Sequence, residues 1–432
     1  MSDWRVSPAE QAPAAGRGAK RVASHFLRSA CLPAAFAAVL QGCDRAPSAG
    51  VVSPFHDPSI PTWHVVLQPE LQLGGADERE GYVFDGVRGA ALLSDRLAVA
   101  DGGSLEIRFY TLDGAFVARS GRRGAGPGEY QWITTIAPFG DTAVGVWDGL
   151  LSRITIVDRG GNVVRTLEPD LSGTSGVFSV QFVGTLQQGQ LVFADRTSIR
   201  ALQDAEPGPR QDSVAVTILD ADGRWNGTVL KQRGPETWLF REGSFWNNDE
   251  ILFARSAFQA VAGGDLVLAT NDSLEFSRVD GDGEVVASAV LPWTHRPVTR
   301  AEAEAERAAR LREAENLPKL YSSTLINGRP FRELVAPFQR RAIERLPASE
   351  AWPAFGEMRG DAAGRVWVAE YLGRASTATE RTWIVLDPEF RPVGRVVLPA
   401  GFQMLAVGED RIVGLSKDDW GREAVSIYRI RR

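Results

Sequence analysis

Short apolar runs that end at an acidic or amide residue recur along the chain, and a polar turn follows each of them. The runs are Leu97–Asp101, Val144–Asp148, Leu191–Asp195, Leu266–Asp272, Val366–Glu370 and Ile412–Asp418. The first three terminal acids are spaced 47 residues apart, and the last two are 48 residues apart. Apolar runs between turn residues predict β-strands, and a constant spacing predicts that one supersecondary unit is repeated.

A second pair of strands follows most of these runs, and its turn is rich in Asp and Gly. The five pairs lie within 107–117, 154–164, 216–223, 276–286 and 383–390. Such a turn between alternating residues is a strong hairpin signal. Four strands in a unit of about 45 residues are typical of a propeller blade. We therefore predict an all-β fold, a six-bladed β-propeller.

The sixth unit, Met404–Ile430, contains only three predicted strands before the chain stops. The apolar run Trp63–Leu73, near the other end of the propeller, can supply the missing outer strand. Pairing strands from both ends would remove an exposed sheet edge, which otherwise invites aggregation. We therefore predict that the ring is closed by an N-terminal strand.

Two insertions interrupt the repeat. The segment Gln203–Asp212 is rich in Pro, Gly and charge, and predicts a mobile hairpin tip in blade three. The segment 299–347, between blades four and five, changes to Ala, Glu and Arg. Thr299 and Glu302 fit a capping box, so we predict a helix to Glu315. We predict a second helix at 331–346, kinked or interrupted at Pro337. The helical insert would be a lid, a partner surface or a passive cover.

The N-terminal part of the chain predicts an export signal. Basic residues precede an apolar run from Ala30 to Leu40, too short to span a bilayer. The run ends in Leu40-Gln41-Gly42-Cys43, which resembles a bacterial lipobox and would make Cys43 the lipid-attachment residue; the alternative is an ordinary signal peptide. We predict a signal peptide at 1–42, a flexible tether at 43–62 and the propeller at 63–432.

Charge and cysteine content restrict the function further. The formal net charge is −6, which argues against a nucleic-acid binder. The two cysteines, Cys31 and Cys43, both lie before the propeller, so no thiol is left there for metal binding or nucleophilic catalysis. We expect a monomer in the bacterial cell envelope, periplasm-facing or surface-exposed, and attached to the membrane through its lipid anchor only.

The recurring acids are the main candidates for chemistry. If their strands lie near the ring axis, the acids would surround one mouth of the central channel and could hold a hard cation such as Ca²⁺. These candidate ligands are Asp101, Asp148, Asp195, Asp272, Glu370 and Asp418. The alternative is that each carboxylate accepts hydrogen bonds from nearby backbone N–H groups. Recurrence in nearly every unit favours this structural role, and no catalytic residue is predicted.

For three other features we favour a structural role. The loop Gly121–Tyr130 is rich in glycine but lacks the Lys-Ser/Thr of a phosphate-binding loop, and predicts an inter-blade loop in which Tyr130 packs over a neighbour. His295 lies at the junction between blade four and the insert, where a turn or surface role is favoured. Trp246 and Trp420 could bind sugars or peptides, although blades commonly bury tryptophan.

Four features resemble the bacterial six-bladed, NHL-like β-propeller lipoproteins. They are the Gly124–Tyr130 loop, the Asp361–Val368 strand pair, the helical insert and the closing run 425–430. The resemblance implies an envelope-anchored binding or scaffolding module for a protein, peptide or glycan ligand, without a cofactor. Some six-bladed relatives resemble metal-dependent gluconolactonases. The alternative is therefore a divalent-metal-dependent hydrolase or lactonase that uses the channel carboxylates, with Ca²⁺ as its cofactor.

Overall fold

The computed structural model describes residues 53–66, 68–172, 174, 180–195, 202, 204–315, 325–326 and 329–432. One compact unit covers Val52–Arg432. The predicted signal peptide, Cys43 and the first part of the predicted tether lie outside the described residues. No helix in the described part of the chain has the length and apolar character needed to cross a membrane.

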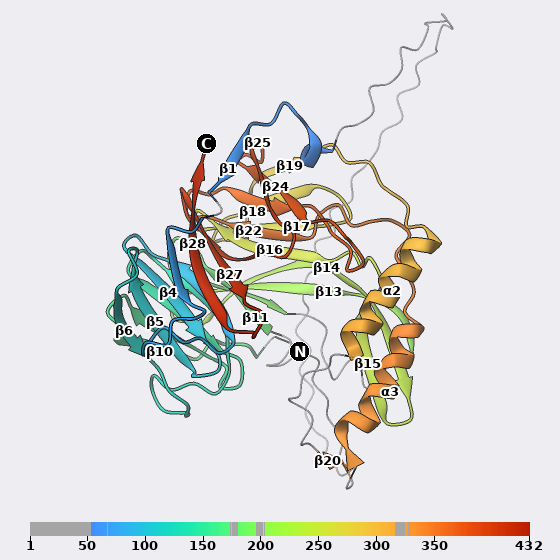
Figure 1. Cartoon of the computed structure of the whole chain (residues 1–432), viewed down its shortest axis with the longest axis horizontal. Helices are drawn as coiled ribbons and strands as arrows, with labels where there is room; N and C mark the ends of the chain where they lie inside the picture. The colour runs from blue at the N-terminus through green and yellow to red at the C-terminus, as the bar shows by residue number, and fades with distance from the viewer. Residues whose placement is uncertain are drawn as a thin grey trace, which may run out of the picture. The chain divides into compact units, whose positions relative to one another are not determined.

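Six antiparallel strand units, which we call blades one to six, follow one another along the chain (Figure 1). Blade one contains β3 (Val87–Leu92), β4 (Arg96–Asp101), β5 (Glu106–Thr111) and β6 (Phe116–Ser120). Blade two contains β7 (Ile133–Phe139), β8 (Ala143–Asp148), β9 (Arg153–Asp158) and β10 (Val163–Leu167). Blade four contains β16 (Ala257–Ala262), β17 (Asp265–Thr270), β18 (Glu275–Val279) and β19 (Val285–Val290).

The other three blades carry additions. Blade three contains β11 (Val180–Thr185), β12 (Leu191–Asp195), β13 (Gly208–Leu219) and β14 (Trp225–Glu242), with β15 (Phe245–Glu250) as a fifth strand. Blade five contains β22 (Glu357–Gly360), β23 (Val366–Ala369), β24 (Glu380–Leu386) and β25 (Pro392–Pro399). Blade six contains β26 (Gln403–Val407), β27 (Arg411–Lys417), β28 (Glu423–Arg431) and β2 (Leu71–Gly74).

The first strand of each blade contacts the first strand of the next blade. The contacts run in a closed cycle through β3, β7, β11, β16, β22, β26 and back to β3. Four-stranded antiparallel sheets in such a cycle are consistent with a six-bladed β-propeller. Because the described part of the chain also contains the α-helices α2 (Arg300–Glu315) and α3 (Phe331–Glu344), the fold is mostly β rather than all-β.

The N-terminal run closes the ring, but it does so with two strands. β2 pairs antiparallel with β28, from Leu71 opposite Ile427 onward, which confirms the predicted outer strand of blade six. β1 (Thr62–Val65) pairs parallel with β25 and antiparallel with the end of β28. β1 therefore joins blades five and six into one sheet.

Part of the predicted tether belongs to the packed body. Residues Pro54–His56 form a short 3₁₀ helix, η1, that contacts β24. Phe55 is only 1% exposed and packs in the apolar cluster between blades four and five, with Phe276 and Phe390. The structure therefore places the start of the packed body before the predicted boundary at Trp63.

The predicted insert contains two helices, α2 (Arg300–Glu315) and α3 (Phe331–Glu344), with the short strands β20 (Leu325–Ile326) and β21 (Arg329–Pro330). The capping box is confirmed: the Thr299 backbone N–H donates to Glu302 Oε2 (2.9 Å), and the Glu302 N–H donates to Thr299 Oγ1 (3.3 Å). Pro337 lies inside α3, which continues through it, so of the two predicted alternatives, a kink or an interruption, the interruption is wrong.

The helices lie against an extension of blade three rather than over the ring (Figure 1). β13 pairs with β14 from Gly208, opposite Leu239, to Leu219. The described residues 208–212 therefore belong to a paired strand, and the prediction of a mobile tip is wrong for them. α3 packs on this extension: the centroid of its Phe338 ring lies 5.3 Å from that of Phe240 on β14 and 5.6 Å from that of Phe245 on β15.

Candidate functional site

The six first strands enclose a channel with a cavity of about 1030 Å³. All six contribute lining residues, mainly from their second halves and from the turns that follow. Apolar side chains such as Leu92, Val183 and Val261 line it together with the amides Gln181 and Gln259. An apolar cavity of this size with a few polar groups is the usual form of a ligand site.

We label the strands of each blade a to d from the ring axis outward. Since neighbouring strands are antiparallel, the a–b turns lie on one face of the ring and the b–c turns on the other. The cavity reaches the a–b face, because the a–b turn residues Asp141, Gly189, Gly264 and Ala362 line it. The ends of the b strands, and with them the recurring acids, lie toward the b–c face.

None of the six recurring acids lines the cavity. Asp148 shows what such an acid does instead. Its carboxylate is fully buried and accepts backbone N–H groups on two sides, from Gln131 (2.6 Å) and Trp132 (3.3 Å), and from Leu150 and Leu151 (both 3.0 Å). It thereby connects the loop that enters blade two to the b–c turn of the same blade.

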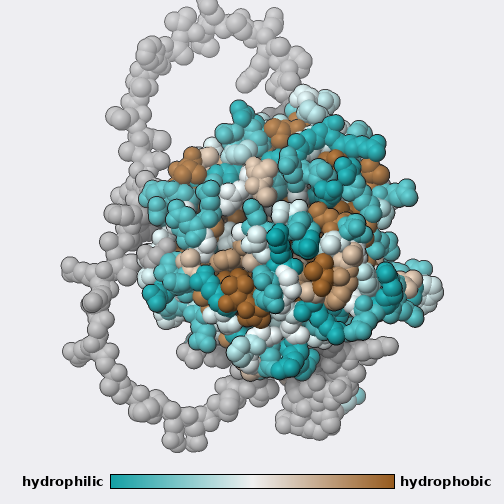
Figure 2. Space-filling view, turned by 90° about the vertical axis from the view of Figure 1, so that its left-hand side faces the viewer, coloured by the Kyte–Doolittle hydropathy of each residue, from teal (hydrophilic) through white to brown (hydrophobic). Residues whose placement is uncertain are grey.

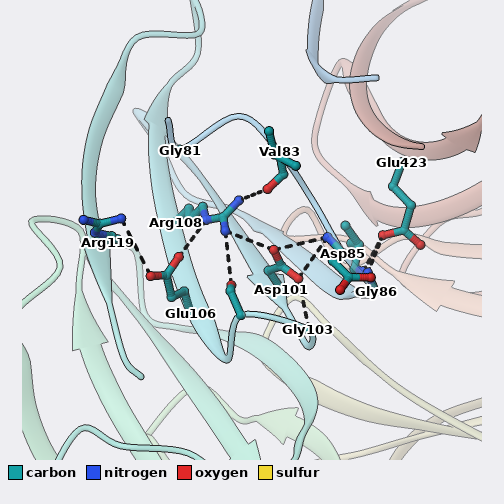
Figure 3. Close-up of polar contacts among 12 residues, drawn as sticks. Gly81, Val83, Asp85, Gly86, Asp101, Gly103, Glu106, Arg108, Arg119 and Glu423 are labelled. Atoms are coloured by element: carbon teal, nitrogen blue, oxygen red, sulfur yellow. Dashed lines mark hydrogen bonds and ion pairs between the residues drawn. The ribbon is translucent and has the colours of Figure 1, made fainter. Parts of the chain in front are cut away.

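Asp101 has the corresponding role in blade one (Figure 3). It accepts the N–H of Asp85 (3.2 Å) and of Gly103 (3.1 Å), and lies 3.1 Å from Arg108 Nη2. Arg108 also contacts Glu106 (3.0 Å), and it donates to the Val83 carbonyl. Burial raises the pKa of Asp101, and the nearby Arg108 charge opposes this only in part.

The other four recurring acids differ from one another in their environment and their partners. Asp195 is buried at the end of β12. Asp272 accepts the Thr270 hydroxyl (2.6 Å) and is 3.6 Å from Arg233. Glu370 Oε1 lies 3.6 Å from His56 Nε2. Asp418 accepts the backbone N–H groups of its own turn, at Trp420 (3.0 Å) and Arg422 (2.9 Å).

Two residues outside the set of candidate ligands also hold loops that enter a blade, as Asp101 and Asp148 do. In blade four, Asn271 accepts the Ser256 N–H (2.6 Å) and donates to the Phe355 carbonyl (2.9 Å). In blade six, Glu423 accepts the N–H groups of Gly86 (2.9 Å) and Val87 (2.6 Å). Asn271 stood in the recurring pattern, whereas no sequence signal pointed to Glu423.

The donor set does not fit the Ca²⁺ site of the alternative hypothesis. Ca²⁺ takes six to eight oxygen ligands at one point. Among the described residues, no three His, Cys, Asp or Glu side chains are grouped in a way that could hold a metal ion. The oxygens of Asp101 and Asp148 already accept backbone N–H groups.

Arg359, on β22, is a charged side chain in the cavity wall and is 43% exposed. Its Nη2 lies 3.6 Å from Glu357 Oε2, whereas the other oxygen of Glu357 is 2.5 Å from Arg381 Nη1. Two guanidinium groups therefore share one carboxylate, which leaves a local charge of about +1.

The carboxylate of Asp361, which also lines the cavity, is fully engaged. It accepts the N–H groups of Ala363 (3.0 Å) and Arg365 (2.9 Å), the Arg365 side chain (2.6 Å) and the Trp367 indole (3.0 Å). Asp361 therefore braces the a–b turn of blade five and does not offer a free charge to the channel.

The glycine-rich loop is structural, as predicted. Gly121 and Gly128 have positive φ, and Glu129 accepts the Gly126 N–H (2.7 Å). Tyr130 is fully buried, and burial raises its pKa to about 12. Of the other predicted candidates, Trp246 is half-buried, while His295 is exposed on the segment before α2.

Exposed apolar side chains offer a second kind of candidate surface. Trp420 is 81% exposed on the b–c turn of blade six. On the side that carries β6 and β10, apolar residues form separate patches among hydrophilic ones (Figure 2). The exposed apolar residues of these two strands are Phe116, Val117, Val163 and Val164. The channel is the more enclosed of the two candidates.

No family model matches the chain, and no curated protein matches it in sequence. Similar solved structures include a DUF4221 family member from Bacteroides vulgatus ATCC 8482, with 12% identity, 86% of this chain and 99% of that chain covered, and a TM-score of 0.44. Regucalcin, a calcium-binding protein from Agrobacterium tumefaciens strain C58, has 12% identity, coverages of 86% and 96%, and a TM-score of 0.36. A streptogramin B lyase has 9% identity, coverages of 84% and 87%, and a TM-score of 0.36. At these identities and TM-scores, the propeller assignment rests on the closed cycle of strands.

Proposed function

We propose that the protein is a six-bladed propeller that acts as a binding module and takes its ligand into the channel from the a–b face. The cavity of about 1030 Å³, formed by all six a strands, carries this proposal. Its apolar walls would supply contact area, and its amides would orient the ligand. A protein segment, a peptide or a glycan of the cell envelope is the ligand class that we expect.

The proposal includes the cellular context predicted from the sequence. A lipid on Cys43 would hold the protein at a bacterial envelope membrane, with the propeller as a monomer in the periplasm or at the cell surface. Globomycin treatment of expressing cells, which blocks lipoprotein signal cleavage, tests this part. Accumulation of the uncleaved chain supports the lipid anchor, and unchanged processing contradicts it.

A blocking substitution tests the ligand site. Gln181 lies in the cavity wall and is exposed, so Gln181→Trp would fill space without disturbing the core. Val286→Trp, at an exposed position of β19 outside the cavity, is the matched control. The purified full chain would be screened against peptide and oligosaccharide panels by thermal shift.

A ligand at 100 times its Kd stabilises the folded state by about 2.7 kcal/mol. We expect hits that stabilise the wild type and Val286→Trp but not Gln181→Trp. Hits that stabilise all three proteins equally would place the ligand outside the channel. A full panel without a hit would contradict the proposed ligand class.

A further inference from the structure

We propose that the channel recognises a short peptide through its C-terminal carboxylate, with Arg359 as the anion-binding residue. This inference rests on the proposed binding function of the channel and names its ligand more closely. It is carried by three observations: the singular position of Arg359 in the repeat, its unfilled hydrogen-bonding capacity, and the chemistry of the walls around it.

Arg359 breaks the repeat pattern of the a strands. It pairs with Trp367, three residues before the recurring acid position at Glu370. The equivalent residues in blades one to three are small: Ala91, Ala137 and Gly184. Blades four and six have longer runs. There the second residues of the runs, Val267 and Val413, lie opposite Ala260 and Ala406, as Trp367 lies opposite Arg359. A residue type that recurs in the other five blades serves the fold, whereas a departure in one blade indicates a local function.

The guanidinium of Arg359 retains donors. It has five N–H groups, of which one contacts the Met358 carbonyl (3.2 Å). The 3.6 Å separation from Glu357 is too long for a direct hydrogen bond. Glu357 is committed to Arg381, which is mostly buried and also donates to the Glu370 carbonyl (2.7 Å). A ligand carboxylate could therefore bind Arg359 in the bidentate manner that guanidinium groups favour.

The other charged groups of the cavity do not offer an equivalent site. Arg165 donates to Asp222 (3.0 Å) and to the Ala221 carbonyl (2.9 Å). Asp158 accepts the N–H groups of its own turn, as Asp361 does. Asp141 is exposed at the rim in blade two, across the ring from blade five. Of the two arginines in the described cavity wall, Arg359 is therefore the one that makes no direct hydrogen bond to a carboxylate.

The walls favour a peptide over another anion. Gln259 Nε2 donates to Gln232 Oε1 (2.6 Å), and Gln232 donates to the Ala269 carbonyl (3.2 Å), which holds the Gln259 amide in place in the cavity wall. Gln181 presents a second amide. Amides donate to and accept from peptide groups equally well, and Leu92, Val261 and Leu405 can contact apolar side chains.

Equilibrium dialysis of the full chain against two matched probes tests the inference. One is a pool of N-acetylated tetrapeptides with free C-terminal carboxylates, and the other is the same pool with C-terminal amides. Retained peptides are quantified by mass spectrometry. We expect the acid pool to be retained at least tenfold better by the wild type, and Arg359→Gln to lose this preference.

Two further variants separate the roles. Arg359→Lys keeps the charge and should keep part of the preference, and Arg165→Gln, at the cavity rim, should keep all of it. Circular dichroism would check that each variant is folded. Equal retention of both pools by the wild type, abolished by Gln181→Trp, would overturn the carboxylate inference while the channel remains a ligand site. Retention of neither pool at millimolar peptide would overturn it as well, and the oligosaccharide panel then decides the proposed function.

Discussion

The substitution Asp148→Ala should destabilise the protein far more than the same substitution at Asp418, although both residues belong to one recurring sequence pattern. Asp148 is fully buried and accepts four backbone N–H groups from two loops. Asp418 is partly exposed and serves only its own turn and the Arg422 side chain. The comparison holds residue type constant and changes the environment.

The magnitude follows from the donors that are left without a partner. An unsatisfied buried donor costs about 1–3 kcal/mol. Water can reach part of the Leu150 and Trp132 region, since Leu150 is 48% exposed and Trp132 is half-buried. Counting two fully orphaned donors, we expect a loss of about 2–6 kcal/mol for Asp148→Ala. At Asp418, where water replaces the carboxylate, about 1 kcal/mol is expected.

Urea titration followed by tryptophan fluorescence measures both changes, because Trp147 and Trp132 lie beside the site. The titrations are done with EDTA and again with CaCl₂. If the acids brace backbone, the two conditions give the same difference between the variants. Losses at Asp148 and Asp418 that agree within about 0.5 kcal/mol, or a loss that exists only with Ca²⁺, would refute this reasoning.

Three other perturbations test particular contacts. Asp101→Asn should flatten the pH dependence of stability: because burial raises the folded-state pKa of Asp101, its contribution is present at low pH and is lost as pH rises through that pKa. Urea titrations between about pH 3 and about pH 7 show this, and an unchanged slope contradicts it. Phe55→Ala should cost about 3–5 kcal/mol and expose the N-terminal segment to limited proteolysis, because it empties a buried site between blades four and five; wild-type protease resistance would show that the segment is not docked. Thr299→Ala should cost about 1 kcal/mol and speed amide exchange only in the first turn of α2, whereas unchanged exchange there would remove the capping box from the account.

The repeat pattern predicted the ring because each blade is a local unit. Alternating apolar and polar residues on both sides of an Asp-Gly turn specify a hairpin from its own sequence. The number of repeats at a constant period then indicates how many units pack together. The capping box at Thr299 was predictable for the same reason, since both partners lie within four residues. Features that depend on distant segments were not. The split of 63–73 into two strands needs β25, and the buried position of Phe55 needs blades four and five.

The candidate site shows where sequence reasoning misdirects attention in a repeat protein. The acids are conspicuous because they recur, and they recur because every blade must fix the loop that enters it, as Asp101 and Asp148 do. Arg359 was overlooked because a single arginine in a chain with many arginines carries no signal. Its significance appears only when the strand pairing shows that Ala91, Ala137 and Gly184 hold the same position elsewhere.

The two faces of the ring therefore differ in what they can offer a ligand. Toward the b–c face, the oxygens of the buried acids accept hydrogen bonds from backbone N–H groups, and Asp148 accepts four of them. On the side that opens to the a–b face, the walls are apolar, the Gln259 amide is held in place and Arg359 keeps donors to spare. A ligand group gains most binding free energy where the protein's polar atoms are already oriented but lack hydrogen-bond partners, because few side chains must then be ordered on binding. By this criterion, substitutions in the cavity wall should alter ligand binding with little loss of stability, whereas substitutions of Asp101 or Asp148 should do the reverse.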